Sequence, residues 1–218
     1  MKDRISGTAR HTIRSSHPAE LTGIFDPGTQ IALWERPEDP AIVRYLNTHH
    51  RPLGCGVRGL MNPGCPPNLD DLPAGDGRNA LAADMAALAE LLTDLLGCPQ
   101  VGFRLEVIDR AMCPRFHVDR VGIRLLCTYR GPGTEWIDDG EADRSRLGAG
   151  APGLPDGSSG LMPPSTPIEA ATAFQVALLK GSLWQGNTRR GVIHRSPAVP
   201  EATLPRVVLA LDAIWEER

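Results

Sequence analysis

The stretch CPRFHVDRVGIRLLCTY, residues 113–129, joins a polar extended segment to a long apolar run. Its second half, residues 122–129, is rich in branched and aromatic side chains, which is typical of a buried β-strand. In its first half, His117 and Asp119 are two residues apart, and on extended backbone such side chains project from the same face. The stretch therefore predicts a strand that is entered from a segment with an imidazole and a carboxylate side by side.

Further strands are expected on both sides of this stretch. Residues 102–108 alternate apolar and charged side chains, which indicates a strand with one buried face. Three more apolar runs lie downstream, at residues 174–181, 191–196 and 206–215. Because no helical segment of useful length separates these strands, we expect a mostly antiparallel sheet that closes into a barrel or a double-sheet jelly roll.

The N-terminal part has a different texture. We expect residues 1–99 to be helical or irregular and to pack on a core formed by residues 100–218, within one integrated domain. Residues 37–50 indicate a short helix opened by proline and acidic side chains. Residues 78–96 are the clearest helix, since apolar side chains recur at spacings of three and four, and Gly97 is expected to end it. The predicted fold class is α+β, a jelly-roll core with N-terminal helices packed against it.

The segment 138–167 is rich in Gly, Pro, Ser and Asp and holds few apolar side chains. We expect a long surface loop. A loop of this length inside a compact domain is either a functional cover or a disordered connection, and both alternatives stay open.

Composition and charge exclude several classes of function. The 218-residue chain has a formal net charge of −3 with acidic and basic residues interleaved, so it lacks the basic surface that phosphate-backbone binding requires. It has no apolar run long enough to cross a bilayer and no apolar signal core. We therefore expect a cytoplasmic protein that binds neither nucleic acid nor membrane. The five cysteines form no C-x-x-C pair, which predicts reduced thiols, and Cys127 is expected in the core.

The histidines favour one partner for His117 and Asp119. Of the other five, two lie in a polar N-terminal arm and two close the first predicted helix, which leaves His194 near a predicted strand. Two imidazoles and one carboxylate on one face of a metal ion leave the opposite face open, as in non-haem Fe(II) oxygenases. The same donors suit Zn(II), and without a metal they are solvated polar groups at strand edges. Cys113 either adds a fourth ligand, which makes a closed zinc site, or is a loop thiol.

Arg206 begins the last predicted strand, where a guanidinium can hold a carboxylate through two hydrogen bonds. It lies on the face opposite Val207, Leu209 and Leu211. If that apolar face packs on the helices, Arg206 points into the barrel; otherwise it is a surface charge. Two other groups of side chains also have two interpretations. Arg189, Arg190 and Arg195 either steer an anionic substrate toward the site or belong to a solvated turn. Trp136 and Trp184 either line the mouth of a pocket or pack in the core.

The order of these residues carries a resemblance. The series His117-x-Asp119, Gly131-Pro-Gly-Thr134-Glu-Trp136, Gly181, His194 and Arg206 resembles the 2-oxoglutarate/Fe(II) dioxygenase superfamily. The resemblance implies a double-stranded β-helix core, Fe(II) held by His117, Asp119 and His194, and 2-oxoglutarate held by Arg206 and Thr134. More closely, the phrases at 113–136, 178–187 and 191–197 resemble an uncharacterised bacterial family, domain of unknown function 1826. That family has no established activity, and its relatives are thought to sit in zinc-responsive gene neighbourhoods.

Three hypotheses follow. The leading one is an Fe(II)- and 2-oxoglutarate-dependent oxygenase acting on a small molecule or a peptide, with no catalytic residue indicated beyond the metal ligands. The alternative is a zinc-binding protein of metal homeostasis without oxygenase activity. The third is a metal-free sheet module that binds a partner.

Overall fold

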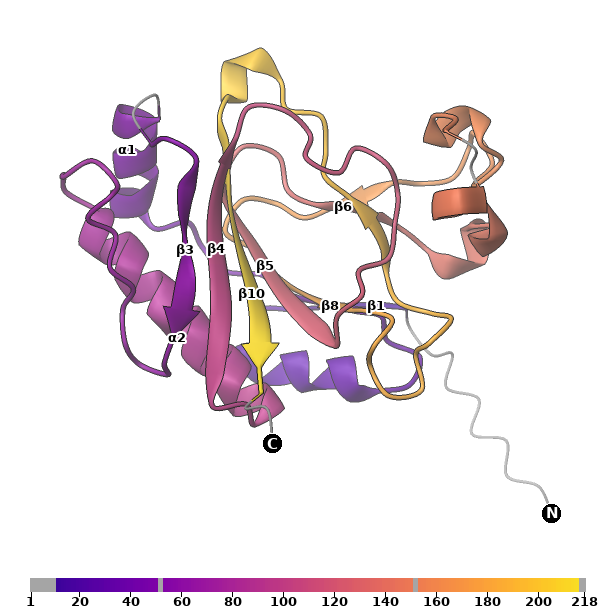
Figure 1. Cartoon of the computed structure of the whole chain (residues 1–218), viewed down its shortest axis with the longest axis horizontal. Helices are drawn as coiled ribbons and strands as arrows, with labels where there is room; N and C mark the ends of the chain where they lie inside the picture. The colour runs from indigo at the N-terminus through magenta and orange to yellow at the C-terminus, as the bar shows by residue number, and fades with distance from the viewer. Residues whose placement is uncertain (1–10, 51–52, 151–152, 216–218) are drawn as a thin grey trace.

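A computed structural model describes residues 11–50, 53–150 and 153–215, which form a mixed α+β fold with two sheets (Figure 1). The large sheet has seven strands in the order β1-β2-β8-β5-β10-β4-β3, and every neighbouring pair except β1 and β2 is antiparallel. The small sheet has three antiparallel strands in the order β7-β6-β9. The expected mostly antiparallel sheet is thus confirmed.

Strands, α-helices and short 3-10 helices all occur in the described part of the chain. The strands are β1 (Thr12–Ser15), β2 (Ile31–Trp34), β3 (Gly56–Met61), β4 (Gln100–Ile108), β5 (Ile123–Arg130), β6 (Glu135–Ile137), β7 (Glu169–Ala170), β8 (Val176–Lys180), β9 (Ile193–Arg195) and β10 (Arg206–Ile214). The α-helices are α1 (Pro40–His49) and α2 (Arg78–Leu96), and the 3-10 helices are η1 (Pro18–Phe25), η2 (Asp139–Glu141), η3 (Arg144–Arg146), η4 (Gly148–Gly150), η5 (Asp156–Ser158) and η6 (Glu201–Thr203).

Both α-helices confirm the sequence predictions. The Asp39 side chain caps α1 by accepting hydrogen bonds from the first backbone N–H groups of the helix. Gly97 ends α2 in the left-handed conformation, with φ of 69°, and its N–H donates to the Thr93 carbonyl. The apolar stripe of α2 packs in a core shared with the large sheet. No helix in the described ranges is long and apolar enough to span a bilayer.

Side chains along the central strands alternate between the two faces of the large sheet. On β10, Val207, Leu209 and Leu211 are fully buried in the core that contains α2. The side chains between them, beginning with Arg206, line a cavity on the opposite face. The sequence left open whether Arg206 points inward or is a surface charge. Because the apolar face of this strand packs on the helices, Arg206 points between the sheets.

The N-terminal part corrects one expectation, because it contributes three strands to the large sheet. β2 pairs with β8, β1 extends the sheet beyond β2, and β3 pairs with β4 at the other edge. The prediction that residues 1–99 are helical or irregular is wrong for these segments. They are four to six residues long, and their extended form depends on pairing with strands that are remote in the sequence.

The segment 138–167 also differs from expectation. Its described residues form four short 3-10 helices, and Leu161 is buried in an apolar cluster with Phe116, Ile137 and Ile193. The Asp156 carboxylate is buried as well and accepts a hydrogen bond from the Phe116 backbone N–H at 3.0 Å. The segment therefore packs against the chain that leads into the site, and the expectation of a surface loop is wrong at Leu161 and Asp156.

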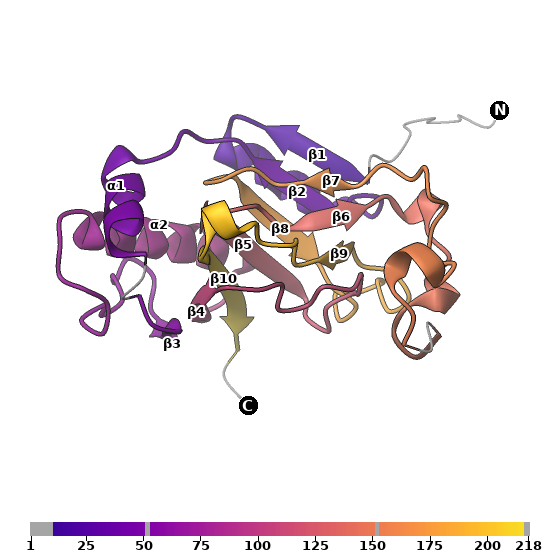
Figure 2. The same cartoon turned by 90° about the horizontal axis from the view of Figure 1, so that it is seen from above.

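After α2 the chain alternates between the sheets. β4, β5, β8 and β10 lie in the large sheet, whereas a bridge at His117, then β6, β7 and β9, form the opposite layer. Figure 2 shows β6, β7 and β9 on the side of the molecule away from α1 and α2. Residues of β4, β5 and β10 in the large sheet, and of β9 and the His117 bridge in the opposite layer, line the cavity between the sheets.

Candidate metal centre

His117 and His194 lie directly opposite each other on neighbouring extended segments. Each backbone N–H donates to the other residue's carbonyl oxygen at 2.9 Å, which forms an isolated antiparallel bridge. Side chains of such a pair leave the sheet on the same face, and the two ring centroids are 4.5 Å apart. Backbone pairing therefore brings together two imidazoles from distant parts of the sequence.

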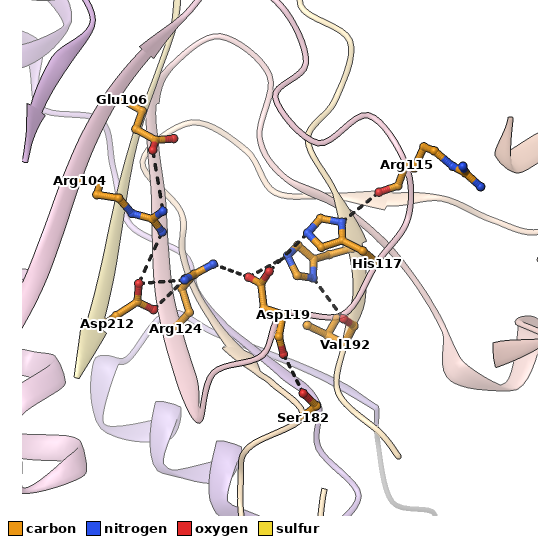
Figure 3. Close-up of polar contacts among 10 residues, drawn as sticks. Arg104, Glu106, Arg115, His117, Asp119, Arg124, Ser182, Val192 and Asp212 are labelled. Atoms are coloured by element: carbon orange, nitrogen blue, oxygen red, sulfur yellow. Dashed lines mark hydrogen bonds and ion pairs between the residues drawn. The ribbon is translucent and has the colours of Figure 1, made fainter. Parts of the chain in front are cut away.

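Both rings are held with the same nitrogen facing the backbone. Nδ1 of His117 lies 2.9 Å from the Arg115 carbonyl oxygen, and Nδ1 of His194 lies 3.1 Å from that of Val192. Because a carbonyl oxygen only accepts, Nδ1 carries a proton in each ring. In the neutral ring the lone pair is then on Nε2, the atom available to a metal ion. Nε2 of His117 points toward Asp119 (Figure 3), and Nε2 of His194 faces the same carboxylate.

Asp119 completes a three-residue cluster. Its Oδ1 is 3.4 Å from Nε2 of His117, and its Oδ2 is 3.3 Å from Nε2 of His194. Metal–ligand bonds of about 2.0–2.2 Å place neighbouring ligand atoms about 3 Å apart, so these atoms need only small shifts to share one ion. In the part of the chain that the structure describes, this is the one group of three or more potential ligands with atoms within 4.8 Å of one another.

The backbone of Asp119 is fixed by the residues that follow β8. Its carbonyl oxygen accepts from the Ser182 N–H at 3.0 Å and from the Ser182 hydroxyl at 3.3 Å. A Cβ at Gly181 would lie 2.8 Å from that same oxygen. The glycine at this position therefore permits the close approach that holds Asp119 in place.

Charge interactions keep the Asp119 carboxyl ionised. Burial raises its pKa, but hydrogen bonds with His117 and His194 and the charge of Arg124 outweigh burial and hold the pKa well below the usual range. The hydrogen bond with Asp119 is the largest influence on His117 and raises the pKa of that imidazole. At neutral pH Asp119 is therefore an anionic oxygen donor, and a metal ion would take the place of the proton that its hydrogen bond with Nε2 of His117 requires.

Arg124 lies on the other side of Asp119. Its Nη1 donates to Asp119 Oδ2 at 2.5 Å, while its Nε and Nη2 donate to the Asp212 carboxylate at 2.8 and 2.9 Å. Arg124 and Asp212 are paired directly across the β5–β10 ladder. Arg104 approaches Asp212 at 3.5 Å and Glu106 at 4.0 Å. A row of charges thus crosses three strands and ends at Asp119 (Figure 3).

The cluster opens on a cavity of about 130 Å³ between the sheets. One part of the wall is formed by His117, Asp119 and His194. Another part is formed by Arg206 and Thr134, the two residues expected to bind a carboxylate co-substrate. The structure therefore brings all five residues singled out in the sequence to one cavity.

Arg206 is a buried cation whose close partners are all neutral. Its side chain donates to the Pro132 carbonyl at 2.7 Å and to the hydroxyls of Thr134, Ser196 and Thr128 at 3.1, 3.2 and 3.2 Å. Burial lowers the pKa of Arg206 to about 10. Among the residues described, no carboxylate lies within 4.0 Å of this guanidinium, which is 3% exposed. Such a group favours an anion in the adjoining cavity.

The glycine turn before β6 is shaped around Arg206. Gly131 has φ of 84°, and a Cβ there would lie 3.2 Å from the Cα and Cβ of Arg206. The turn continues into Pro132 and Thr134, which both accept hydrogen bonds from the guanidinium. The Gly-Pro-Gly-Thr motif at residues 131–134 thus forms part of the surroundings of the buried Arg206.

Other sequence candidates have clear outcomes. Cys113 lines the cavity but lies outside the ligand cluster, which favours the loop-thiol interpretation. Arg195 is neither free nor in a solvated turn, because it pairs with Glu135 at 2.6 Å and Asp156 at 3.2 Å. Arg189 and Arg190 are exposed, and Trp136 and Trp184 pack against core clusters. His11 is half-buried, and Cys127 is fully buried.

Sequence reasoning missed Arg124 and Asp212. A usable signal existed, since both are charged positions within otherwise apolar strands, and Asp212 shares a strand face with Arg206. Neither residue type nor spacing indicates that the two pair with each other, because their contact depends on the β5–β10 register.

Comparisons with known proteins give one family match and several similar solved structures. The model of a family described as "Protein of unknown function (DUF1826)" matches residues 15–212. No curated protein matches the chain. Similar solved structures include the dioxygenase for auxin oxidation 1 from Arabidopsis thaliana in a complex with 2-oxoglutarate, at 11% identity over 94% of this chain and 92% of that chain, with a TM-score of 0.48. The rice dioxygenase for auxin oxidation is 16% identical over 93% and 82%, with a TM-score of 0.48. A Pseudomonas putida prolyl-4-hydroxylase is 14% identical over 92% and 96%, with a TM-score of 0.46.

Proposed function

The chain belongs to the DUF1826 family, and we propose that it is a mononuclear metal protein, an Fe(II)- and 2-oxoglutarate-dependent oxygenase that acts on a small molecule or a peptide. One observation carries the proposal. A preorganised ligand set of two histidines and one aspartate faces the same cavity as a buried arginine with only neutral partners.

The donor set fits a divalent first-row metal. His117 and His194 would bind through Nε2 and Asp119 through a carboxylate oxygen, and the contacts at Nδ1 already select the required tautomer. Two imidazoles and one carboxylate on one side of an ion form the facial triad of non-haem iron oxygenases, in which iron supplies oxidation of a substrate by O2. The chain's own part is to orient the three ligands and to leave the cavity side open.

Arg206 fits a carboxylate of 2-oxoglutarate. Its guanidinium provides a positive charge that no carboxylate of the described chain neutralises at contact distance, and a bidentate pair with a ligand carboxylate would do so. The Thr134 hydroxyl accepts from Arg206 and keeps its own proton to donate to a bound anion. The two residues together form the anion end of the proposed site.

The path of the chain supports a double-stranded β-helix. Between β4 and β10 the chain passes back and forth between the large and the small layer, and the two histidines come from the small layer while Arg206 comes from the large one. This is the connectivity expected of a jelly roll with a site between its sheets.

A zinc protein is the second candidate, because Zn(II) accepts the same donors. Arg206 favours the oxygenase, since storage or delivery of zinc gives no role to a buried cation beside the ligands. Metal analysis separates the two: stoichiometric zinc without 2-oxoglutarate binding would support the zinc protein.

The test is anaerobic addition of Fe(II) and then 2-oxoglutarate to the purified protein, followed by visible absorption. We expect the charge-transfer band of an iron-chelated 2-oxo acid in the wild type and in Cys113→Ala, whose thiol lies outside the ligand cluster. His194→Ala should lose the band. A wild-type protein that binds Fe(II) but never develops the band contradicts the oxygenase.

A further inference from the structure

The two carboxylate oxygens of Asp119 have unequal surroundings. Oδ1 lies 3.4 Å from Nε2 of His117, whereas Oδ2 lies 3.3 Å from Nε2 of His194 and also accepts from Arg124 at 2.5 Å. A carboxylate can bind a metal ion through one oxygen or through both, and the second mode uses an additional coordination position. The contact between Arg124 and Oδ2 therefore affects how many coordination positions of a bound metal ion the protein fills.

Arg124 is held firmly where it contacts Asp119. Its guanidinium makes two hydrogen bonds to Asp212, at 2.8 and 2.9 Å, from a position directly across the β5–β10 ladder. Its side chain is 17% exposed and sits on a strand flanked on both sides by others. Charge-assisted hydrogen bonds of this geometry are the strong ones in proteins, so the Arg124 group near Oδ2 is fixed by the sheet and not by Asp119 alone.

We propose that Arg124 is a positioning residue whose hydrogen bond occupies Oδ2 of Asp119, so that Asp119 binds the metal through Oδ1 alone. The inference rests on the proposed metal centre and adds a specific role to a residue outside it. With one atom from each of three side chains, an octahedral ion keeps three open positions; with both oxygens of Asp119, it keeps two. A co-substrate that chelates through two atoms then leaves a further position free only in the first case.

The number of open positions is measurable without turnover. Water molecules occupy those positions on Mn(II), and the water-proton relaxivity of protein-bound Mn(II) rises with their number. Bound Mn(II) is counted from the electron paramagnetic resonance signal of the free ion. We expect Arg124→Met to lower the relaxivity for each bound ion by about a third, from three waters to two.

Two variants control this measurement. Arg104→Met removes the other arginine that contacts Asp212. Because Arg104 makes no described contact with Asp119, this variant should leave the relaxivity unchanged. Arg124→Lys keeps a cation for Oδ2 and should restore most of the lost relaxivity. If Arg124→Met does not fold, Asp212→Asn provides the test, because it keeps the side-chain volume but weakens the hold on Arg124, and it should lower the relaxivity partly.

The outcomes separate the inference from the metal centre. A wild type that binds neither Mn(II) nor Fe(II) overturns both. A wild type that binds Mn(II), with the same relaxivity in Arg124→Met or in Asp212→Asn where that variant replaces it, overturns only the role of Arg124. An equal fall in Arg104→Met also overturns it, since the effect would then belong to the charge row in general.

Discussion

Replacing Arg206 with methionine should weaken 2-oxoglutarate binding at least about 30-fold while leaving the free protein about as stable as before. Methionine preserves most of the side-chain volume and removes the charge. A cation that serves only the fold would behave differently, because its loss would lower stability. The two effects together therefore identify the purpose of this buried group.

The magnitude for stability follows from the surroundings of Arg206. Burial lowers its pKa from the usual 12.5 to about 10, which at about 1.4 kcal/mol for each tenfold change corresponds to roughly 3 kcal/mol against the charged form. Because the folded-state pKa is lowered, this cost is present at every pH below about 10, including pH 7. Methionine removes it but also removes hydrogen bonds to four neutral acceptors, at roughly 1 kcal/mol each. The unfolding free energy should therefore change by about 1 kcal/mol or less.

The magnitude for binding is larger. Removing one partner of a desolvated, hydrogen-bonded charge pair costs roughly 2–5 kcal/mol, or about 30-fold to several-thousand-fold in Kd. At a 2-oxoglutarate concentration of about 100 times the wild-type Kd, the wild type should gain about 2.7 kcal/mol of stability. The variant should gain less than about 1 kcal/mol under the same conditions.

Urea unfolding of the metal-loaded, oxygen-free protein with and without 2-oxoglutarate measures both quantities. Arg195→Met is the matched control, because Arg195 lines the same cavity but pairs with Glu135 and the buried Asp156. We expect that variant to lose roughly 1–3 kcal/mol of stability and to keep its response to 2-oxoglutarate. The reasoning is refuted if Arg206→Met loses more than about 3 kcal/mol of stability and still responds to 2-oxoglutarate as the wild type does.

Three further results are expected. His117→Ala should remove stoichiometric metal from the purified protein, as measured by inductively coupled plasma mass spectrometry, because it deletes one of three ligands; full retention of the metal would contradict the proposed centre. Asp84→Ala should lower the unfolding free energy in urea by about 3–5 kcal/mol, because Arg36, which now donates two hydrogen bonds to Asp84 at 2.5 and 2.8 Å, would be left as an unpaired, largely buried cation; a loss below about 1 kcal/mol would argue against this. Cys127 should resist alkylation in the native protein, since burial raises its pKa to about 12, whereas the exposed Cys113 should react; equal labelling of the two in peptide mass spectrometry would show that the core opens readily.

The sequence by itself determined the elements whose pattern is local. Apolar spacing of three and four predicted α2 with its observed bounds, and period-two alternation predicted β4 and the two faces of β10. The spacing of His117 and Asp119 placed both on one face of an extended segment. These features depend on the geometry of one stretch of backbone, so neighbouring residues carry enough information to specify them.

Only the tertiary structure decided which distant groups meet. β1, β2 and β3 are strands because other strands complete their hydrogen bonding, and Leu161 and Asp156 of the 138–167 segment are buried because they pack against Phe116, in the chain that leads into the site. The pairing of His117 with His194, like that of Arg124 with Asp212, follows from strand register. Register is set by the packing of whole sheets, and a slip of one residue would turn each of these side chains to the opposite face. The sequence could therefore name the candidate ligands, but the convergence of their donor atoms and the charge beside them are properties of the assembled sheets.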